Sequence, residues 1–231
     1  MKARMGLGIA ALVVVFLTGC ATPPQAPVSL APETLATKTS RIGVAMTALP
    51  KVDTHLPGAG CLLCLAVASA ANSSLTAHAK TLPYEDLPTL KDQAAEVIRK
   101  KGAQVVVISD DLNIESLPDF KGSAPNTAKK DFSSLKGKYN IDKLLVINVS
   151  TLGFLRTYAS YVPTSDPKGV MTGTGFIVNL SNNTYEWFNP VNITKSSDGK
   201  WDEPPKFPGL TNAYFQTLEL GKDSFLKPLG N

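Results

Sequence analysis

Three short runs of β-branched and aliphatic residues, separated by helical segments, constrain the fold of this chain most strongly. The runs are 41–49 (RIGVAMTAL), 105–109 (VVVIS) and 143–149 (KLLVINV). The polar and apolar residues between them predict helices over 86–101 and 130–138. Strands that alternate with helices at this spacing are typical of an α/β core.

The helix expected from Asp86 to Lys101 has signals at both ends. Asp86 is a candidate N-cap, and Pro88 lies in the first turn, where proline is tolerated. Lys101 and the preceding Lys100 add favourable positive charge at the C-terminus, and Gly102 ends the helix.

In the second half of the chain, three strand-like runs follow one another with only short links between them. The segments 153–161, 170–180 and 184–191 predict three strands of an antiparallel meander. Gly173 and Gly175 lie two residues apart, hence on one face of a strand, and indicate a bulge or the close approach of another element.

A last helix is expected over 211–220, docked by Tyr214 and Leu218. The predicted fold class is therefore α/β (α+β), with a three-layer-like core of strands and helices, an antiparallel meander and a C-terminal helix. We assign this fold to one domain over residues 41–231, long enough to bury a sizeable core.

The N-terminus has the layout of an export signal. Lys2 and Arg4 precede an uncharged apolar run over 5–17, which is too short to span a bilayer as a helix, since that needs about 20 residues. The sequence Leu17-Thr18-Gly19-Cys20 follows and resembles the lipobox of bacterial lipoproteins. That resemblance implies a signal peptide over 1–19 and a diacylglycerol, with palmitate-type acyl chains, on Cys20.

Lipidation at Cys20 implies attachment to a membrane, because two or more acyl chains bind a bilayer stably. Ala21 follows the cysteine, which by resemblance to enterobacterial sorting favours the periplasmic face of the outer membrane. Residues 20–40 are rich in proline and have no periodic apolar face, so we expect a lipid-anchored, extended tether.

The charge balance argues against a nucleic-acid partner. The chain has 23 basic and 19 acidic residues. Removal of Lys2 and Arg4 with the signal leaves 21 basic residues, a net charge of about +2. No basic run or alternation of aromatic and basic residues is present.

Cys61 and Cys64 form a CxxC pair, and four interpretations of it are open. The two cysteines form a disulfide, act as a redox pair with a lowered thiol pKa, bind a metal ion, or pack as two unbonded apolar residues. His55 and His78, the only histidines, flank the pair and would complete a zinc ligand set. The spacing favours a disulfide or plain packing, and no cofactor is assigned.

The stretch 59–71 (AGCLLCLAVASAA) is apolar and rich in small residues. It predicts a helix that runs toward His78. A buried core helix is the favoured interpretation, and an interface for a partner or for self-association is the alternative.

The order of elements resembles periplasmic lipoproteins related to the curli secretion channel, the Pel polysaccharide lipoprotein and the penicillin-binding-protein activator. The segments 100–108 (KKGAQVVVI) and 139–149 (YNIDKLLVINV) carry the likeness. The segments around 61–74 and 201–215 depart from it. This resemblance implies an assembly or docking module and a homo-oligomer.

No nucleophile elbow, phosphate loop or metalloprotease motif is present in the sequence. The predicted function is therefore a non-enzymatic assembly, scaffold or accessory factor in the cell envelope, with an envelope protein as its partner. The alternative is a periplasmic metal- or thiol-handling protein that uses Cys61 and Cys64.

Overall fold

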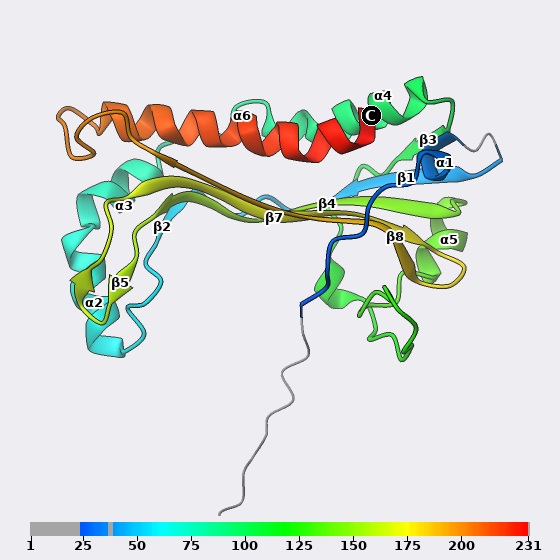
Figure 1. The fold of residues 1–231 in the computed structure, drawn as a ribbon, viewed down its shortest axis with the longest axis horizontal. Coiled ribbons are helices and arrows are strands. Elements are labelled where there is room, and N and C mark those ends of the chain that lie inside the picture. The colour runs from blue at the N-terminus through cyan, green and yellow to red at the C-terminus, as the bar shows by residue number, and fades with distance from the viewer. Residues whose placement is uncertain (1–23, 37–38, 231) are drawn as a thin grey trace, which may run out of the picture.

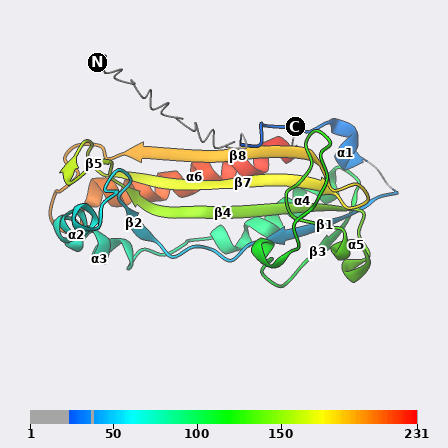
Figure 2. The same cartoon turned by 90° about the horizontal axis from the view of Figure 1, so that it is seen from below.

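A six-stranded mixed sheet runs the length of the molecule (Figures 1 and 2). The computed structural model describes residues 24–36 and 39–230. The strands occur in the order β3-β1-β4-β7-β8, and β2 pairs with the far end of β4. Their bounds are β1 Arg41–Met46, β2 Asp53–His55, β3 Gln104–Val107, β4 Lys143–Leu155, β7 Lys168–Asn179 and β8 Thr184–Ser196.

Helices and loops cover both faces of the sheet. One face carries α4 (Leu90–Lys100) and α6 (Pro208–Gly230), and the other carries α5 (Ser134–Tyr139) with a long loop (Figure 1). The smaller elements are α1 Pro32–Ala36, α2 Leu62–Ala71, α3 Ser73–Ala79, the 3-10 turns η1 Leu87–Thr89 and η2 Ile114–Ser116, and the two-residue strands β5 Tyr158–Ala159 and β6 Val162–Pro163.

Alternation along β4 divides the core between the two faces. Leu145 and Ile147 belong to the cluster under α4 and α6, whereas Leu144 and Val146 belong to the cluster beside α5. Successive side chains of a strand point to opposite faces, so the apolar run 143–149 fills both clusters. The α/β class with a sheet between helices is confirmed.

The three predicted strands of the first half are present as β1, β3 and β4, and β1 pairs in parallel with both β3 and β4. The meander differs from the prediction, because 153–161 is not a separate strand. Its first residues continue β4, which pairs with β7 from Lys143 to Leu155 across a bulge between Val149 and Thr151.

The predicted close approaches at two glycines are confirmed. A Cβ atom on Gly173 would lie 2.2 Å from the Asn148 carbonyl oxygen, beside the bulge in β4. A Cβ atom on Gly175 would lie 2.7 Å from the ring of Trp187 on β8. Both positions therefore require the absence of a side chain.

The final helix is longer than predicted. Tyr214 and Leu218 are buried as expected, and Phe225 and Leu229 continue the same face to the end of α6. These later residues keep the helical spacing, so the apolar face extends by about two and a half turns beyond 220.

The segment expected to be an extended tether is partly docked. Val28 exchanges two backbone hydrogen bonds with Phe188 of β8, at 2.9 and 3.0 Å. Leu35 of α1 is buried in the core. Residues 24–36 therefore lie partly against the body through Val28 and Leu35, and the lipid-anchored tether over 20–40 stays a prediction. The signal peptide and Cys20 lie outside the described residues.

The predicted N-cap at Asp86 is wrong. Asp86 makes no capping hydrogen bond, and the α-helix begins at Leu90 after the turn η1. Instead its carboxylate accepts a hydrogen bond from the buried ammonium of Lys222 on α6, which also pairs with Glu219 at 2.7 Å. The hydrogen bond from Lys222 lowers the pKa of Asp86. The same ion pair joins α6 to the turn that precedes α4.

This pairing predicts acid sensitivity. A carboxyl group with a lowered folded pKa stabilises the fold at neutral pH, and that contribution is lost as the pH falls through the lowered value. We expect Asp86→Asn to cost about 1 kcal/mol at pH 7, since the carboxylate is half exposed, and to flatten the loss of stability below pH 4. Urea unfolding at pH 7 and pH 3 measures this, and Asp223→Asn at an exposed pair is the control. An unchanged acid profile in Asp86→Asn contradicts the assignment.

Candidate functional site

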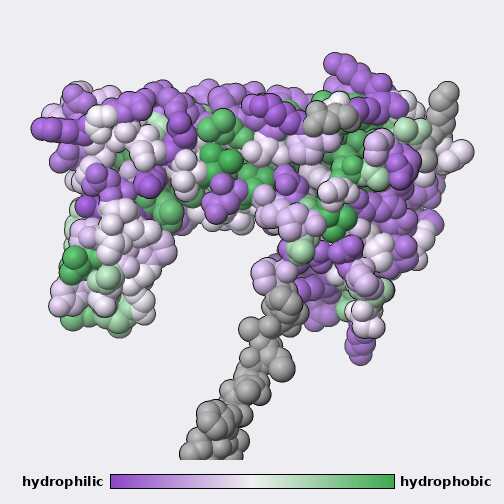
Figure 3. All heavy atoms as spheres, viewed as in Figure 1, coloured by the Kyte–Doolittle hydropathy of each residue, from purple (hydrophilic) through white to green (hydrophobic). Residues whose placement is uncertain are grey.

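One end of the molecule carries an arm that projects from the sheet (Figure 1). We define the arm as residues 56–79, which contain α2 and α3, together with residues 156–165, which contain β5 and β6. Figure 3 shows this projection as a separate lobe, with apolar residues gathered toward its end and a hollow between it and the opposite lobe.

The arm exposes most of its large apolar side chains. Leu62 is 89% and Leu63 is 72% exposed, and Leu65 and Val67 on the same helix are also exposed. Of the residues of α2, only Cys64 and Ala68 are buried, one turn apart on a single face. The favoured prediction of a buried core helix is therefore wrong, because α2 contacts the rest of the protein through one narrow stripe.

The β5–β6 hairpin adds to this surface, since Tyr161 and Val162 at its turn are exposed. No Asp, Glu, Lys or Arg occurs between Asp53 and Lys80 or between Arg156 and Asp166. The arm therefore presents an uncharged apolar end, and such contiguous patches on soluble proteins mark interaction sites.

A buried polar group holds the arm together. Asn72, at the bend between α2 and α3, is 2% exposed. Its side-chain NH₂ donates to the Ala68 carbonyl at 2.7 Å and to the Tyr158 hydroxyl at 2.6 Å. Its carbonyl accepts from the Arg156 guanidinium at 3.1 Å. Asn72 thus joins the helices of the arm to the hairpin beside them.

The Arg156 side chain connects the arm to the C-terminal half of the chain. Its Nε donates to the Ser165 carbonyl at 3.2 Å, and its guanidinium lies 4.9 Å from the ring centre of Trp201. Trp201 stacks on Phe207, and both rings pack against the main core. Arg156 and Trp201 therefore connect the arm to the main core of the protein.

A glycine permits the contact between the loop before α2 and the hairpin. Gly58 has φ +89°, and a Cβ atom there would lie 1.8 Å from the Tyr158 carbonyl oxygen. The Tyr158 N–H donates to the Pro57 carbonyl at 2.8 Å, and the Ser160 N–H donates to the Gly58 carbonyl at 3.2 Å. These hydrogen bonds hold the loop before α2 against the β5–β6 hairpin.

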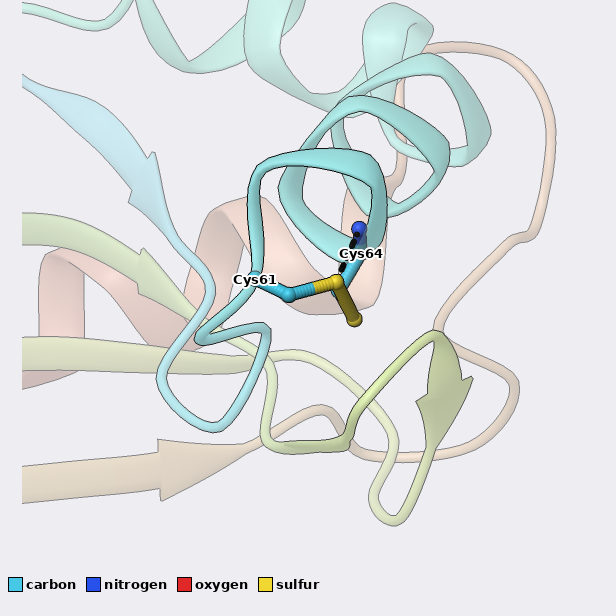
Figure 4. Close-up of a disulfide and its surroundings, with 2 residues drawn as sticks. All are labelled: Cys61 and Cys64. Atoms are coloured by element: carbon cyan, nitrogen blue, oxygen red, sulfur yellow. Dashed lines mark hydrogen bonds between the residues drawn. A yellow bond between two sulfur atoms is a disulfide. The ribbon is translucent and has the colours of Figure 1, made fainter.

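A disulfide joins Cys61 to Cys64 at the start of α2 (Figure 4). Cys61 is the N-cap residue, and its sulfur accepts from the Cys64 backbone N–H at 2.9 Å. The bond closes the first turn of the helix at the exposed end of the arm. Of the four interpretations of the CxxC pair, this structure contains the disulfide.

The two histidines do not join the cysteines. The His55 ring lies 3.2 Å from the Leu152 carbonyl oxygen, and the His78 ring lies 2.7 Å from the Thr211 hydroxyl and stacks near Phe154. Burial, together with the nearby Lys206 charge, lowers the pKa of His78. Within residues 24–36 and 39–230, no three His, Cys, Asp or Glu residues are grouped to hold a metal ion.

The sequence did not indicate a groove where the N-terminal segment meets the body. It has a volume of about 960 Å³ and lies between Pro24, Gln25 and the loop 114–132. Tyr185 and Phe188 of β8 form its apolar wall. The groove opens on the face of the sheet opposite α6.

Across the described part of the chain, no single helix is long and apolar enough to cross a bilayer. The pair α2 and α3 passes that test only when taken together, and the two helices are bent by 72° at Asn72.

No family model matches the chain, and no curated protein matches it. Solved structures with a similar fold include the PelC dodecamer from Paraburkholderia phytofirmans, with 11% identity over 89% of this chain and 95% of that one, at a TM-score of 0.35. A DUF330 protein from Xanthomonas campestris has 10% identity over 87% of this chain and 90% of its own, at a TM-score of 0.37. A lipoprotein from Neisseria meningitidis has 13% identity over 78% of this chain and 95% of its own, at a TM-score of 0.27. At these identities and scores the likeness is one of fold alone.

Proposed function

We propose that this protein is a lipid-anchored lipoprotein of the outer membrane, and that it acts as a non-enzymatic assembly, scaffold or accessory factor in the cell envelope. The observation that carries the proposal is the Leu17–Cys20 motif after a short apolar run and a basic start. The exposed apolar arm supports a role in contact with other envelope components, because such a surface is costly to leave in water.

The docked N-terminal segment determines how the anchor holds the body. Pro24 is already part of the groove described above, and only four peptide units separate it from Cys20. An extended chain of that length reaches at most about 14 Å. A lipid on Cys20 therefore holds the body against the membrane surface, without a long tether.

Fractionation of cells that express the wild type or Cys20→Ala tests this proposal. We expect the wild type to sediment and float with the outer membrane, and its envelope crosslinks to depend on Cys20. We expect Cys20→Ala to be absent from the outer-membrane fraction. Recovery of both forms in a soluble fraction, with the same crosslinks, contradicts the proposal.

Self-association remains a prediction that follows from the resemblance to the curli and Pel lipoproteins. Light scattering of the detergent-extracted protein over a range of concentrations measures it. A mass that stays at one chain at the highest concentration argues against a homo-oligomer.

A further inference from the structure

The end of the arm has the chemistry of a surface that enters lipid. Leu62, Leu63 and Val67 project from α2, and Tyr161 and Val162 project from the neighbouring hairpin. No charged side chain interrupts either segment. Uncharged apolar side chains favour the acyl region of a bilayer, and tyrosine favours its boundary with the headgroups.

The arm and the N-terminal segment lie on the same side of the sheet. In Figure 1 the described chain begins below the sheet, the arm projects downward from its left end, and α4 and α6 cover the upper face. The lipid expected on Cys20 is within about 14 Å of Pro24 along the chain. The membrane therefore lies below the sheet in this view, on the side toward which the arm points.

We propose that the end of the arm, formed by the first two turns of α2 and the β5–β6 turn, inserts into the lipid leaflet that holds Cys20. This inference rests on the proposed function. It gives the protein a second membrane contact at one end of the sheet, and two contacts fix the orientation of the body on the membrane, which one flexible anchor does not.

The backbone of the arm suits a low-dielectric environment, where polar groups need partners inside the protein. Beyond its first residues α2 pairs its peptide groups along the helix, and near its start the Cys61 sulfur and carbonyl accept from the N–H groups of Cys64 and Leu65. The disulfide removes two thiol groups from this end. In the hairpin, the Thr164 N–H donates to the Thr157 carbonyl at 2.8 Å.

The projecting shape favours lipid over a second copy of the chain. A stable protein interface needs a broad complementary surface with a polar rim. The end of the arm is narrow, and the nearest charged residues in sequence, Asp53, Lys80, Arg156 and Asp166, lie outside it. Lipid accepts a narrow apolar projection without matching its shape.

Fluorescence quenching by lipid tests the inference directly. The lipidated full chain is reconstituted in vesicles of phosphatidylethanolamine and phosphatidylglycerol that contain acyl-brominated phosphatidylcholine. Leu63→Trp places a reporter on the arm, and Leu220→Trp is the matched control, because Leu220 is 41% exposed on α6 across the sheet. The wild type, with Trp187 and Trp201 alone, gives the background signal that is subtracted from both variants. We expect several-fold stronger quenching of the Leu63→Trp reporter than of the control.

The possible results distinguish lipid, water and protein as the surroundings of the arm. Equal, weak quenching of both reporters by bromolipid overturns the inference. If Leu63→Trp is then open to aqueous acrylamide, the arm is free in water, and if it is shielded, a protein such as a second copy covers it. The mass of the N-terminal peptide from the same sample reports the lipid on Cys20. A lipidated chain with an unquenched arm refutes only this inference, whereas an unlipidated chain refutes the proposed function.

Discussion

Gly153→Ala is expected to destabilise the protein by more than about 4 kcal/mol. Gly153 lies in β4 where β2 pairs beside it, and it has φ +127°. A Cβ atom there would lie 2.0 Å from the carbonyl oxygen and 2.8 Å from the nitrogen of Asp53. Both neighbours are backbone atoms, so the strands must separate. Because β2 leads directly into the arm, its displacement also loosens the arm.

Gly102→Ala is the matched control. Gly102 has a similar positive φ of +94°, but no atom beyond its own chain neighbours lies within 4 Å of its Cβ position. Alanine there adds only the strain of a left-handed backbone, about 1–2 kcal/mol. Urea unfolding of both variants measures the difference. Equal losses of stability in the two variants contradict the steric explanation at Gly153.

Asn72→Leu is expected to release the arm while the sheet stays folded. The substitution leaves the Tyr158 hydroxyl and one Arg156 N–H without their buried partner, which costs about 2–3 kcal/mol in local stability. The core of the sheet is remote from these groups, so local opening precedes global unfolding. Hydrogen exchange should accelerate by at least about tenfold in peptides from α2, with β7 unchanged.

Asn212→Leu is the control, since Asn212 is exposed on α6. It should leave exchange in α2 as it is in the wild type. A uniform acceleration across α2 and β7 in Asn72→Leu would mean that the arm and the sheet unfold as one unit, which contradicts the role assigned to Asn72.

The central strands were predictable because their signals are local. The runs in β1, β3 and β4 are short, apolar and rich in β-branched residues, and the helices between them end at ordinary signals such as Gly102. The full length of β4 was not predictable. Its later residues include Ser150 and Gly153, which break the apolar run, and their place in the sheet depends on pairing with β7.

The arm was partly predictable. The sequence indicated a helix in 59–71 but favoured its burial, and it left open whether Cys61 and Cys64 are bonded to each other. Apolar composition shows what a segment prefers as its surroundings, and those surroundings need not belong to the same chain. The role of Asn72 depends on Tyr158 and Arg156, which are distant in sequence, and no local pattern could have revealed it.

The docking of the N-terminal segment was also beyond local patterns. Val28 pairs with Phe188, which is 160 positions later in the chain, and Leu35 joins the main core. Most of 24–31 is neither helix nor strand, in keeping with the prolines around Val28. Proline content alone does not distinguish an extended segment in solvent from one laid on a sheet.

Mass spectrometry of the N-terminal peptide, taken from protein extracted from bacterial membranes, tests directly whether Cys20 is the lipid anchor. We expect a peptide that begins at Cys20 and carries a diacylglyceryl group on its sulfur together with an acyl chain on its amine. A peptide that retains the residues before Cys20, or that begins at Cys20 without lipid, would contradict it.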